Sequence, residues 1–577
     1  MKSEDLVLGY FTQILWTDID AILTLLSTIS LIGILITVIP FLSKQAKYFY
    51  KKIIILKSKY ILVCGLDENN SVYIDSEIKD GNNKIVIIVK DKDNPSIEKY
   101  KNKGLMVKIG DATDLELLAS IKIEKAKHIL VSTGQDLINL EIVTQVLKLD
   151  CNASLYVNIE DRHLRHFHKE QGIFESSSIK IYSYYEEASR DLFNKFNIDG
   201  NDNTIINSNK SFSIAIIGNS HLSHEVISQA CIVGQLPNEN ILKVYCIDKD
   251  IKEFKQSVEL NYTQIDKIQT VSLEYHSLDI NSKSFYQSSI WHDNMTNVII
   301  CLEDEQKNLD IASNLANITY IDKIAEKTLN TNIIFAMFND YNLTKNIKLN
   351  NKVFNNFYTF GCINEISQKD IIINEERDIQ SKCVNYVYNN VVPQILDYQS
   401  YLFEYTKIDT KKPIDIDIEW KKLGYFKQES NRAVADHFKT KLKYLGLKYK
   451  KSNKDFQIIF TMNQSVYESI MNDTLRLKLA KNEHQRWNTF HFLNGFKKMK
   501  IISKEENKKL KSFFELKKEH MCLIPFDEFK NKSDELATKG YELGVLEGYD
   551  FMINEYIPFI MAKSGYEILL IENKEII

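Results

Sequence analysis

The stretch VKIGDATDLELL, Val107–Leu118, decides the first part of the fold. Apolar residues lead into a Gly-Asp turn, and a leucine-rich segment that starts a helix follows the turn. The same order of strand, tight turn and helix begins with YILVCGL, residues 60–66, and the strand-like run IVIIV follows at 85–89. Strands that alternate with helical segments predict an α/β fold with a doubly wound parallel sheet.

Ligands of such sheets bind beyond the carboxyl ends of the strands, where the glycine turns lie. The candidate ligand-binding residues at this edge are Gly65, Asp91, Asp111, Thr133 and Gly134. In such sheets an acidic residue after the second strand accepts hydrogen bonds from a ribose. The alignment of this sequence with the pattern is ambiguous and places either Lys90 or Asp91 at that position. The turn in VKIGDATDLELL is therefore expected to line a nucleotide-sized crevice.

Three motifs in this order carry a resemblance to a known family: ILVCGL at 61–66, KIGDATDLELL at 108–118 and ILVSTGQDLINL at 129–140. They resemble the nucleotide-binding regulatory domain of potassium channels and transporters, the RCK/KTN (TrkA-N) family. One departure is that Asp67 and Asn70 occupy the second and third glycine positions of G-x-G-x-x-G. Because those glycines let the backbone approach a pyrophosphate, two readings stay open for residues 59–200: a ligand-binding domain and a scaffold without ligand.

A second unit, residues 212–375, repeats the pattern after the polar linker at 198–210. Gly218 is its first glycine, and the small residues Ser220 and Ser223 take the other two glycine positions. Asp248 ends the next strand, where it is well placed to accept ribose hydroxyls, and Asp279 stands where Asp111 stood. The sequence predicts a second Rossmann-like domain that either binds a nucleotide or small ligand, or is an inert duplicate.

Residues 380–577 change to long helices with polar clusters such as QESNRA and NEHQRW. The motifs LAKNEHQRWNTFHFLNGF, HMCLIPFDEF and YDFMINEYIPFIMAKSGYEI resemble the ryanodine-receptor repeat (RyR) domain, with an extension in front. That resemblance implies a nucleotide or nucleotide-like ligand, with arginines on phosphate and a tryptophan on a base. The candidate residues are Glu429, Asn431, Arg432, Glu483, His484, Arg486 and Trp487. The alternative is an internally satisfied polar seam between helices.

The amino-terminal part, residues 1–58, contains an uncharged run from 21 to 41 that is long enough for one transmembrane helix. Acidic residues precede this run and lysines follow it, which predicts a single-pass protein of the inner membrane with the bulk of the chain in the cytoplasm. If several copies of the anchor formed a pore, Asp18 and Asp20 would lie at its outer mouth.

Composition narrows the class of function. The net charge of −4 offers no basic field for nucleic acid, and the eight cysteines form no CxxC pair, so we expect neither a nucleic-acid partner nor a metal site. No nucleophile–base motif is present, so we expect no enzyme. The sequence favours a membrane-anchored, homo-oligomeric sensor of a nucleotide (NAD, ATP or a second messenger) that regulates or forms an ion pathway. Two alternatives remain: an anti-phage membrane effector triggered by a nucleotide messenger, and a non-conducting scaffold.

Overall fold

The structure is a computed structural model, and it describes residues 23, 24, 26–30, 55, 57–149, 151–170, 179–200, 211–292, 295–324, 331–339 and 356–571. Most of the predicted transmembrane helix at 21–41, as well as Asp18 and Asp20, lies outside these residues. Within the described part of the chain, no helix combines the length and the apolarity needed to cross a bilayer.

The first sheet has six strands in the order β3-β2-β1-β4-β5-β6. Its strands are β1 (Tyr60–Cys64), β2 (Ile85–Val89), β3 (Met106–Ile109), β4 (Ala126–Val131), β5 (Ser154–Asn158) and β6 (Ile179–Tyr182). Its helices are α2 (Glu68–Lys79), α3 (Ser96–Asn102), α4 (Leu115–Ser120), α5 (Asp136–Leu147), α6 (Arg162–Glu170) and α7 (Tyr184–Lys195). Every residue of β1 and β2 is buried, as expected for strands of a parallel sheet that is covered on both faces.

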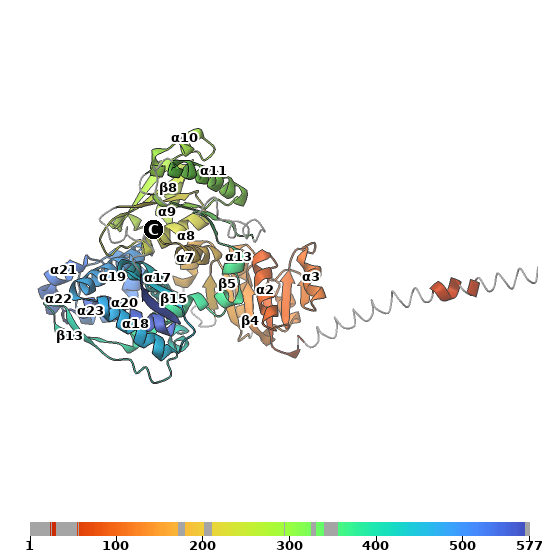
Figure 1. The fold of residues 1–577 in the computed structure, drawn as a ribbon. Helices are drawn as coiled ribbons and strands as arrows, with labels where there is room; N and C mark the ends of the chain where they lie inside the picture. The colour runs from red at the N-terminus through yellow and green to blue at the C-terminus, as the bar shows by residue number, and fades with distance from the viewer. Residues whose placement is uncertain are drawn as a thin grey trace, which may run out of the picture. The chain divides into compact units, whose positions relative to one another are not determined.

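The second sheet repeats this topology, in the order β12-β11-β10-β7-β8-β9. Its part of the chain, with β8, α8, α9, α10 and α11 labelled, is coloured yellow to green in Figure 1. Its strands are β7 (Ser213–Ile217), β8 (Leu242–Asp248), β9 (Val271–Ser277), β10 (Met295–Ile300), β11 (Asn332–Ala336) and β12 (Phe357–Phe360). Its helices are α8 (His221–Val233), α9 (Ile251–Asn261), α10 (Lys283–Tyr286) and α11 (Glu305–Ile324), followed by the short α13 (Ile363–Ile366) and α14 (Lys369–Ile372). The predicted tandem of Rossmann-like α/β units is confirmed.

The C-terminal part is mainly helical, as the sequence predicts. Its helices are α15 (Ile379–Asn390), α16 (Asp417–Trp420), α17 (Tyr425–Tyr444), α18 (Phe456–Ile470), α19 (Asp473–Leu493), α20 (Lys504–Lys517), α21 (Phe526–Asn531), α22 (Ser533–Thr538), α23 (Val545–Glu555) and α24 (Ile557–Lys563). Small two-stranded sheets join β13 (Pro393–Asp397) to β14 (Leu402–Tyr405), β15 (Leu447–Lys451) to β18 (Tyr566–Leu570), and β16 (Lys497–Lys498) to β17 (Glu519–His520).

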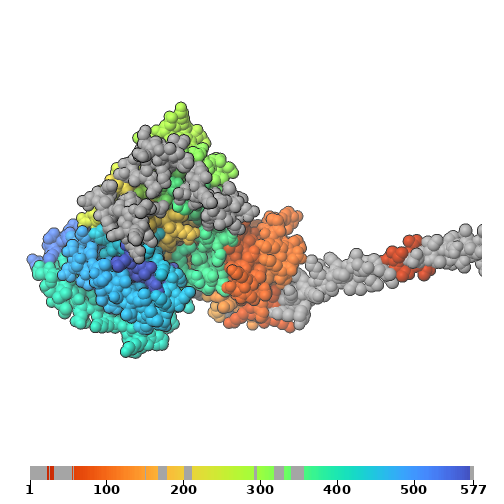
Figure 2. Space-filling view, viewed as in Figure 1, coloured from red at the N-terminus to blue at the C-terminus, as the bar shows by residue number. Residues whose placement is uncertain are grey.

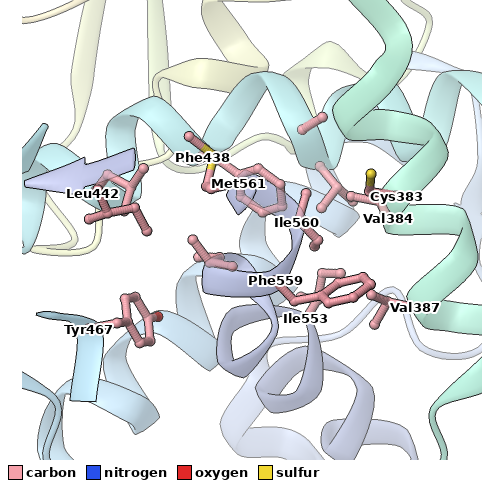
Figure 3. Close-up of a cluster of buried hydrophobic side chains, with 14 of the residues drawn as sticks. Cys383, Val384, Val387, Phe438, Leu442, Tyr467, Ile553, Phe559, Ile560 and Met561 are labelled. Carbon is pink, nitrogen blue, oxygen red and sulfur yellow. The ribbon is translucent and has the colours of Figure 1, made fainter. Parts of the chain in front are cut away.

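The largest of the apolar clusters in this part holds five of these helices together. Side chains of α15, α17, α18, α23 and α24 meet in it, among them the fully buried Val387, Leu442, Tyr467 and Ile560 (Figure 3). The residues around this core, coloured cyan to blue, form a continuous surface in Figure 2. Burial of a leucine, isoleucine or phenylalanine side chain contributes about 1.5–3 kcal/mol, so a core of this size fixes the positions of the polar side chains on the same helices.

Candidate functional site

The glycine turn of the second unit brings a carboxylate to the start of a helix. The N–H of Gly218 donates to the carbonyl of Ile247 at 2.9 Å, and the next residue along β8 is Asp248. Asp248 Oδ2 accepts the N–H of Asn219 at 3.1 Å, so the carboxylate lies against the turn. Gly218 has φ +100°, and a Cβ there would lie 2.6 Å from a side-chain carbon of Leu302, so the turn requires glycine.

The first turn of α8 is capped by its own serines. Ser220 Oγ accepts the N–H of Ser223 at 3.1 Å, and Ser223 Oγ accepts the N–H of Ser220 at 2.9 Å. Ser220 Oγ also donates to the carbonyl of Cys301 at 2.6 Å. This capping box uses two of the N–H groups that a helix amino terminus offers to a phosphate.

A neutral histidine, His224, supports the same turn through a hydrogen bond to the side chain of Asn219. His224 Nδ1 accepts a hydrogen bond from the side chain of Asn261 at 3.0 Å, which leaves the proton on Nε2 to donate to Asn219 Oδ1 at 3.0 Å. Ser257 Oγ donates to the same Asn219 oxygen at 3.0 Å. Burial lowers the pKa of His224 to about 4, which keeps the ring uncharged at neutral pH. His224 and Ser257 therefore hold the side chain of Asn219, while Asp248 accepts its backbone N–H.

The first unit has the same glycine turn but a different residue beside it. Gly65 has φ +106° and donates its N–H to the carbonyl of Ile88 at 2.9 Å, so the residue that matches Asp248 in the register is Val89, which is only 4% exposed. Asp91 lies two residues further, where Oδ1 accepts the N–H of Asp93 at 2.9 Å. Within this unit the register therefore places an apolar side chain, rather than Lys90 or Asp91, at the position that matches Asp248.

Asp111 at the end of β3 is engaged by its neighbours. Its carboxylate pairs with Lys90 Nζ at 2.6 Å and accepts the N–H and the hydroxyl of Thr113 at 3.0 and 2.7 Å. The hydrogen bond from Lys90, followed by those from Thr113, lowers the pKa of Asp111 to about 2. Asp114, the last acid of GDATD, caps α4 by accepting the N–H of Glu116 at 2.9 Å. In the second unit Asp279 makes the matching turn, with Oδ1 accepting the N–H of Asn281 at 2.9 Å.

The motif STGQDLIN has a structural role that the sequence analysis missed. Thr133 is half-buried and Gly134 turns the chain with φ +78° into α5. Asp136 then accepts the N–H groups of Glu160 and Asp161 at 3.0 and 2.7 Å, beyond the end of β5. The motif therefore clamps the carboxyl end of the neighbouring strand.

The second unit repeats this clamp with Glu305 and Asn308. Glu305 Oε1 accepts the N–H groups of Phe338 and Asn339 at 2.8 and 3.2 Å. Asn308 Nδ2 donates to the carbonyl of Ala336 at 3.1 Å, as Asn139 Nδ2 does to that of Asn158 at 2.9 Å. An acid followed three residues later by asparagine, at the start of the helix after the fourth strand, is the signal that could have identified the clamp.

Glu483 and Arg486, two of the RyR candidates, form a buried ion network. Arg486 donates to Glu483 Oε1 from Nε at 3.1 Å and Nη2 at 2.7 Å, and Lys441 Nζ donates to Glu483 Oε2 at 2.6 Å. The side chains of these three residues are at most 1% exposed. Burial alone would raise the pKa of Glu483, but the charges of Arg486 and Lys441 lower it to about 2.

The neighbouring candidates on α19 also have partners inside the protein. His484 contacts Asp550 through Nδ1 at 3.0 Å and the carbonyl of Ile524 through Nε2 at 2.8 Å. Trp487 is half-buried, with its ring centroid 3.8 Å from that of His491 and 4.9 Å from that of His520. Two alternatives were open for this part of the chain, a ligand pocket and an internally satisfied polar seam between helices, and these contacts favour the seam.

The candidates on α17 contribute to a second ion network. Asp378 accepts from Arg432 Nε at 3.0 Å and from Arg190 Nη1 at 2.9 Å, while Arg432 also pairs with Glu429. Asn431 is 7% exposed and lies 3.5 Å from the amide oxygen of Asn385. The charges of Arg432 and Arg190 outweigh burial and hold the pKa of Asp378 well below its usual range.

This second network connects α8 to α17. Asp436 on α17 accepts from Arg190 Nε on α7 and from Gln229 Nε2 on α8, each at 2.9 Å. On the same helix α8, Glu225 pairs with Arg165 of α6. A polar cavity of about 50 Å³ lies among these side chains. A cavity of that volume admits a few water molecules and is too small for a nucleotide.

Residues 61–178 match the family model of the TrkA-N domain. This match confirms the predicted class of the first unit. An uncharacterized protein of Methanothermus fervidus is 35% identical over 112 residues, which are 19% of this chain and 17% of that protein, so the chain spans about a sixth of that relative's length. Within the described residues no group of three or more His, Cys, Asp or Glu side chains is placed to hold a metal ion.

The solved structures that resemble the chain include those of GsuK. The structure of GsuK bound to ADP is 13% identical, covers 55% of this chain and 70% of its own, and has a TM-score of 0.37. The GsuK channel bound to NAD is 11% identical, covers 59% and 68%, and has a TM-score of 0.38. The GsuK RCK domain is 11% identical, covers 59% and 81%, and has a TM-score of 0.36.

Proposed function

We propose that this chain is a nucleotide-responsive regulator whose ligand binds at the glycine turn of the second Rossmann-like unit. The observation that carries the proposal is the position of Asp248 against the turn at Gly218. Each carboxylate oxygen of Asp248 accepts one backbone N–H, from Asn219 at 3.1 Å and from Asp250 at 2.9 Å. Because an ionised carboxylate has about four lone-pair sites, Asp248 retains acceptor capacity for the two hydroxyls of a ribose.

The first unit is the weaker candidate because its turn lacks this acceptor. Val89 provides no hydrogen bond to a ribose, and Asp111 already pairs with Lys90 and Thr113. We assign the first unit a structural role, in which its TrkA-N fold carries α6 and α7 to the contacts with α8 and α17.

The capping box on α8 restricts which part of the ligand is recognised. Since the N–H groups of Ser220 and Ser223 are satisfied by serine hydroxyls, a phosphate gains less here than at a glycine-rich turn. We therefore infer that the sugar contributes more of the affinity than the phosphates do. NAD, ADP and ATP then bind with similar strength, because they share the ribose that Asp248 recognises.

Helix α8 provides the path from the ligand to the helical part of the chain. Its first turn is at Ser220, and the same helix carries Glu225 and Gln229, which hold Arg165 and Asp436. A ligand that shifts the start of α8 thereby changes the contacts of α17. In this proposal the run at 21–41 anchors the protein in the membrane, the RyR-like part receives the movement, and copies of the chain assemble to regulate an ion pathway.

Calorimetric titration of the full chain with NAD, ADP and ATP tests the site. Asp248→Ala is expected to weaken nucleotide binding about 10- to 100-fold, because a hydrogen bond to a charged group contributes about 1.5–3 kcal/mol. Asp91→Ala is the matched control, because Asp91 and Asp248 make the same local hydrogen bond. In each, Oδ1 accepts the backbone N–H of the residue two positions later, Asp93 or Asp250, at 2.9 Å. Equal affinity of wild type and Asp248→Ala, or a loss confined to Asp91→Ala, would refute the assignment.

Ion flux tests the regulatory part of the proposal separately. Vesicles that contain the full chain and an entrapped potassium-sensitive dye should change their permeability when the nucleotide that binds is added outside. Asp248→Ala should require a higher nucleotide concentration for the same change. Tight binding without any change in flux would contradict the ion-transport role and leave the binding site standing.

A further inference from the structure

The segment Lys497–Lys518, which includes α20, concentrates positive charge in a chain that is acidic elsewhere. It holds nine lysines and three glutamates, a net charge of +6, whereas the whole chain has −4. The rest of the chain therefore carries −10. A local field of this sign attracts an anionic partner and is screened by salt.

Helix α20 also exposes apolar side chains on the face that carries two of these lysines. Leu510, Phe513 and Leu516 are 38%, 47% and 74% exposed, and their spacing of three residues places them along one stripe. Lys517 lies with Nζ 4.5 Å from the centroid of the Phe513 ring, and Lys509 pairs with Glu505 at 2.7 Å, where both side chains are at least 70% exposed. The helix therefore combines an apolar stripe with flexible cations.

The protein holds this helix at its ends and leaves its outer face open. The N–H of Lys504 donates to the carbonyl of Lys539 at 2.8 Å, and the carbonyl of Lys518 accepts the N–H of Lys497 at 2.7 Å. Along the 14 residues between Lys504 and Lys517 no side chain is buried. Packing within the chain covers most of Leu510 but does not explain why Phe513 and Leu516 are apolar, since an ordinary solvated helix face is polar.

We propose that α20 docks on the surface of an anionic lipid bilayer. The apolar stripe would enter the headgroup region to about 5–10 Å, with the lysines at the level of the lipid phosphates. A nucleic acid would pair with the lysines through its phosphates but would leave the exposed leucines without an apolar partner. A second copy of the chain accounts for the leucines and brings two segments of charge +6 together.

Hydrogen–deuterium exchange of the full chain tests the docking. Exchange of the peptide 504–518 should be about tenfold slower in vesicles that contain phosphatidylglycerol than in vesicles of phosphatidylcholine alone, and added salt should reduce the difference. The variant Leu510→Ser/Phe513→Ser/Leu516→Ser should lose this protection. Leu260→Ser is the control, because Leu260 is 66% exposed on a different helix, α9.

Two results would overturn the proposal. One is equal exchange of α20 in both lipids. The other is protection that appears without lipid and grows with protein concentration, which would make a second copy of the chain the partner.

Discussion

Removal of the carboxylate of Glu483 should destabilise the helical part of the chain severely. In Glu483→Gln, Lys441 and Arg486 remain at 0% side-chain exposure without the anion that neutralises them. Breaking a buried ion pair by removal of one partner costs about 3–5 kcal/mol, because the remaining charge is desolvated and unpaired. Asn554 still accepts from Lys441 at 2.8 Å, and the Asp550 carboxylate still acts on Lys441 and Arg486 electrostatically, but Glu483 is the carboxylate to which both cations donate.

The same contribution should appear in the pH dependence of stability. The pKa of Glu483 is about 2 in the folded chain against an ordinary 4.5. A lowered folded-state pKa means that the stabilisation is present above pH 4.5 and is lost as the pH falls from 4.5 towards 2. A difference of this size makes about 3 kcal/mol of stability dependent on pH in this range.

Thermal unfolding followed by circular dichroism measures this effect. The midpoint for Glu483→Gln should fall by about 6–20 °C, and the variant should lose the part of the acid sensitivity that lies between pH 4.5 and 2. Glu505→Gln is the control, because the Glu505–Lys509 pair is at least 70% exposed and contributes less than about 1 kcal/mol. A midpoint unchanged in Glu483→Gln, together with a loss of ligand binding, would refute the polar seam and restore the ligand pocket.

Three further substitutions test the second Rossmann-like unit. Gly218→Ala should lower the free energy of unfolding by about 1–3 kcal/mol in urea titrations, because of its φ of +100°, whereas Gly424→Ala, with nothing within 4 Å of the added Cβ, should be nearly neutral. Asn308→Ala should cost about 1–3 kcal/mol by the same measurement, since it removes the hydrogen bonds of Asn308 with the half-buried N–H of Leu302 and the buried carbonyl of Ala336. The exposed Asn314→Ala should cost less than about 0.5 kcal/mol. Because folding lowers the pKa of His224 to about 4, the unfolded chain binds the proton more tightly, and stability falls as the pH drops from 6.5 to about 4. The variant His224→Gln should lack this part of the pH dependence, about 3 kcal/mol, in acid titrations followed by fluorescence.

The strand–turn–helix pattern sufficed to predict the fold because each element carries its signal locally. The runs YILVC and IVIIV are uniformly apolar, and glycine at 65 and 218 is required by a positive φ. The duplication was equally visible, since both units repeat the glycine turn after the first strand and an aspartate, Asp111 or Asp279, after the third.

The candidate site was only partly predictable, because ion pairs join residues that are remote in sequence. Arg432 looks available in a helix pattern, yet it pairs with Asp378, which precedes α15. Glu483 lies three residues from Arg486 on the same helix, but the cation that shares this carboxylate, Lys441, comes from α17. Which residue of the first unit matches Asp248 also depends on strand register, and the register gives Val89. None of these pairings follows from spacing alone.

Mass spectrometry of small molecules that copurify with the full chain tests the central claim most directly. We expect a ribonucleotide with the wild type and with Asp91→Ala, and a strongly reduced amount with Asp248→Ala. The account would be contradicted if Asp248→Ala yielded the same nucleotide at the same level as the wild type. It would also be contradicted if the wild type yielded no nucleotide and bound none on titration.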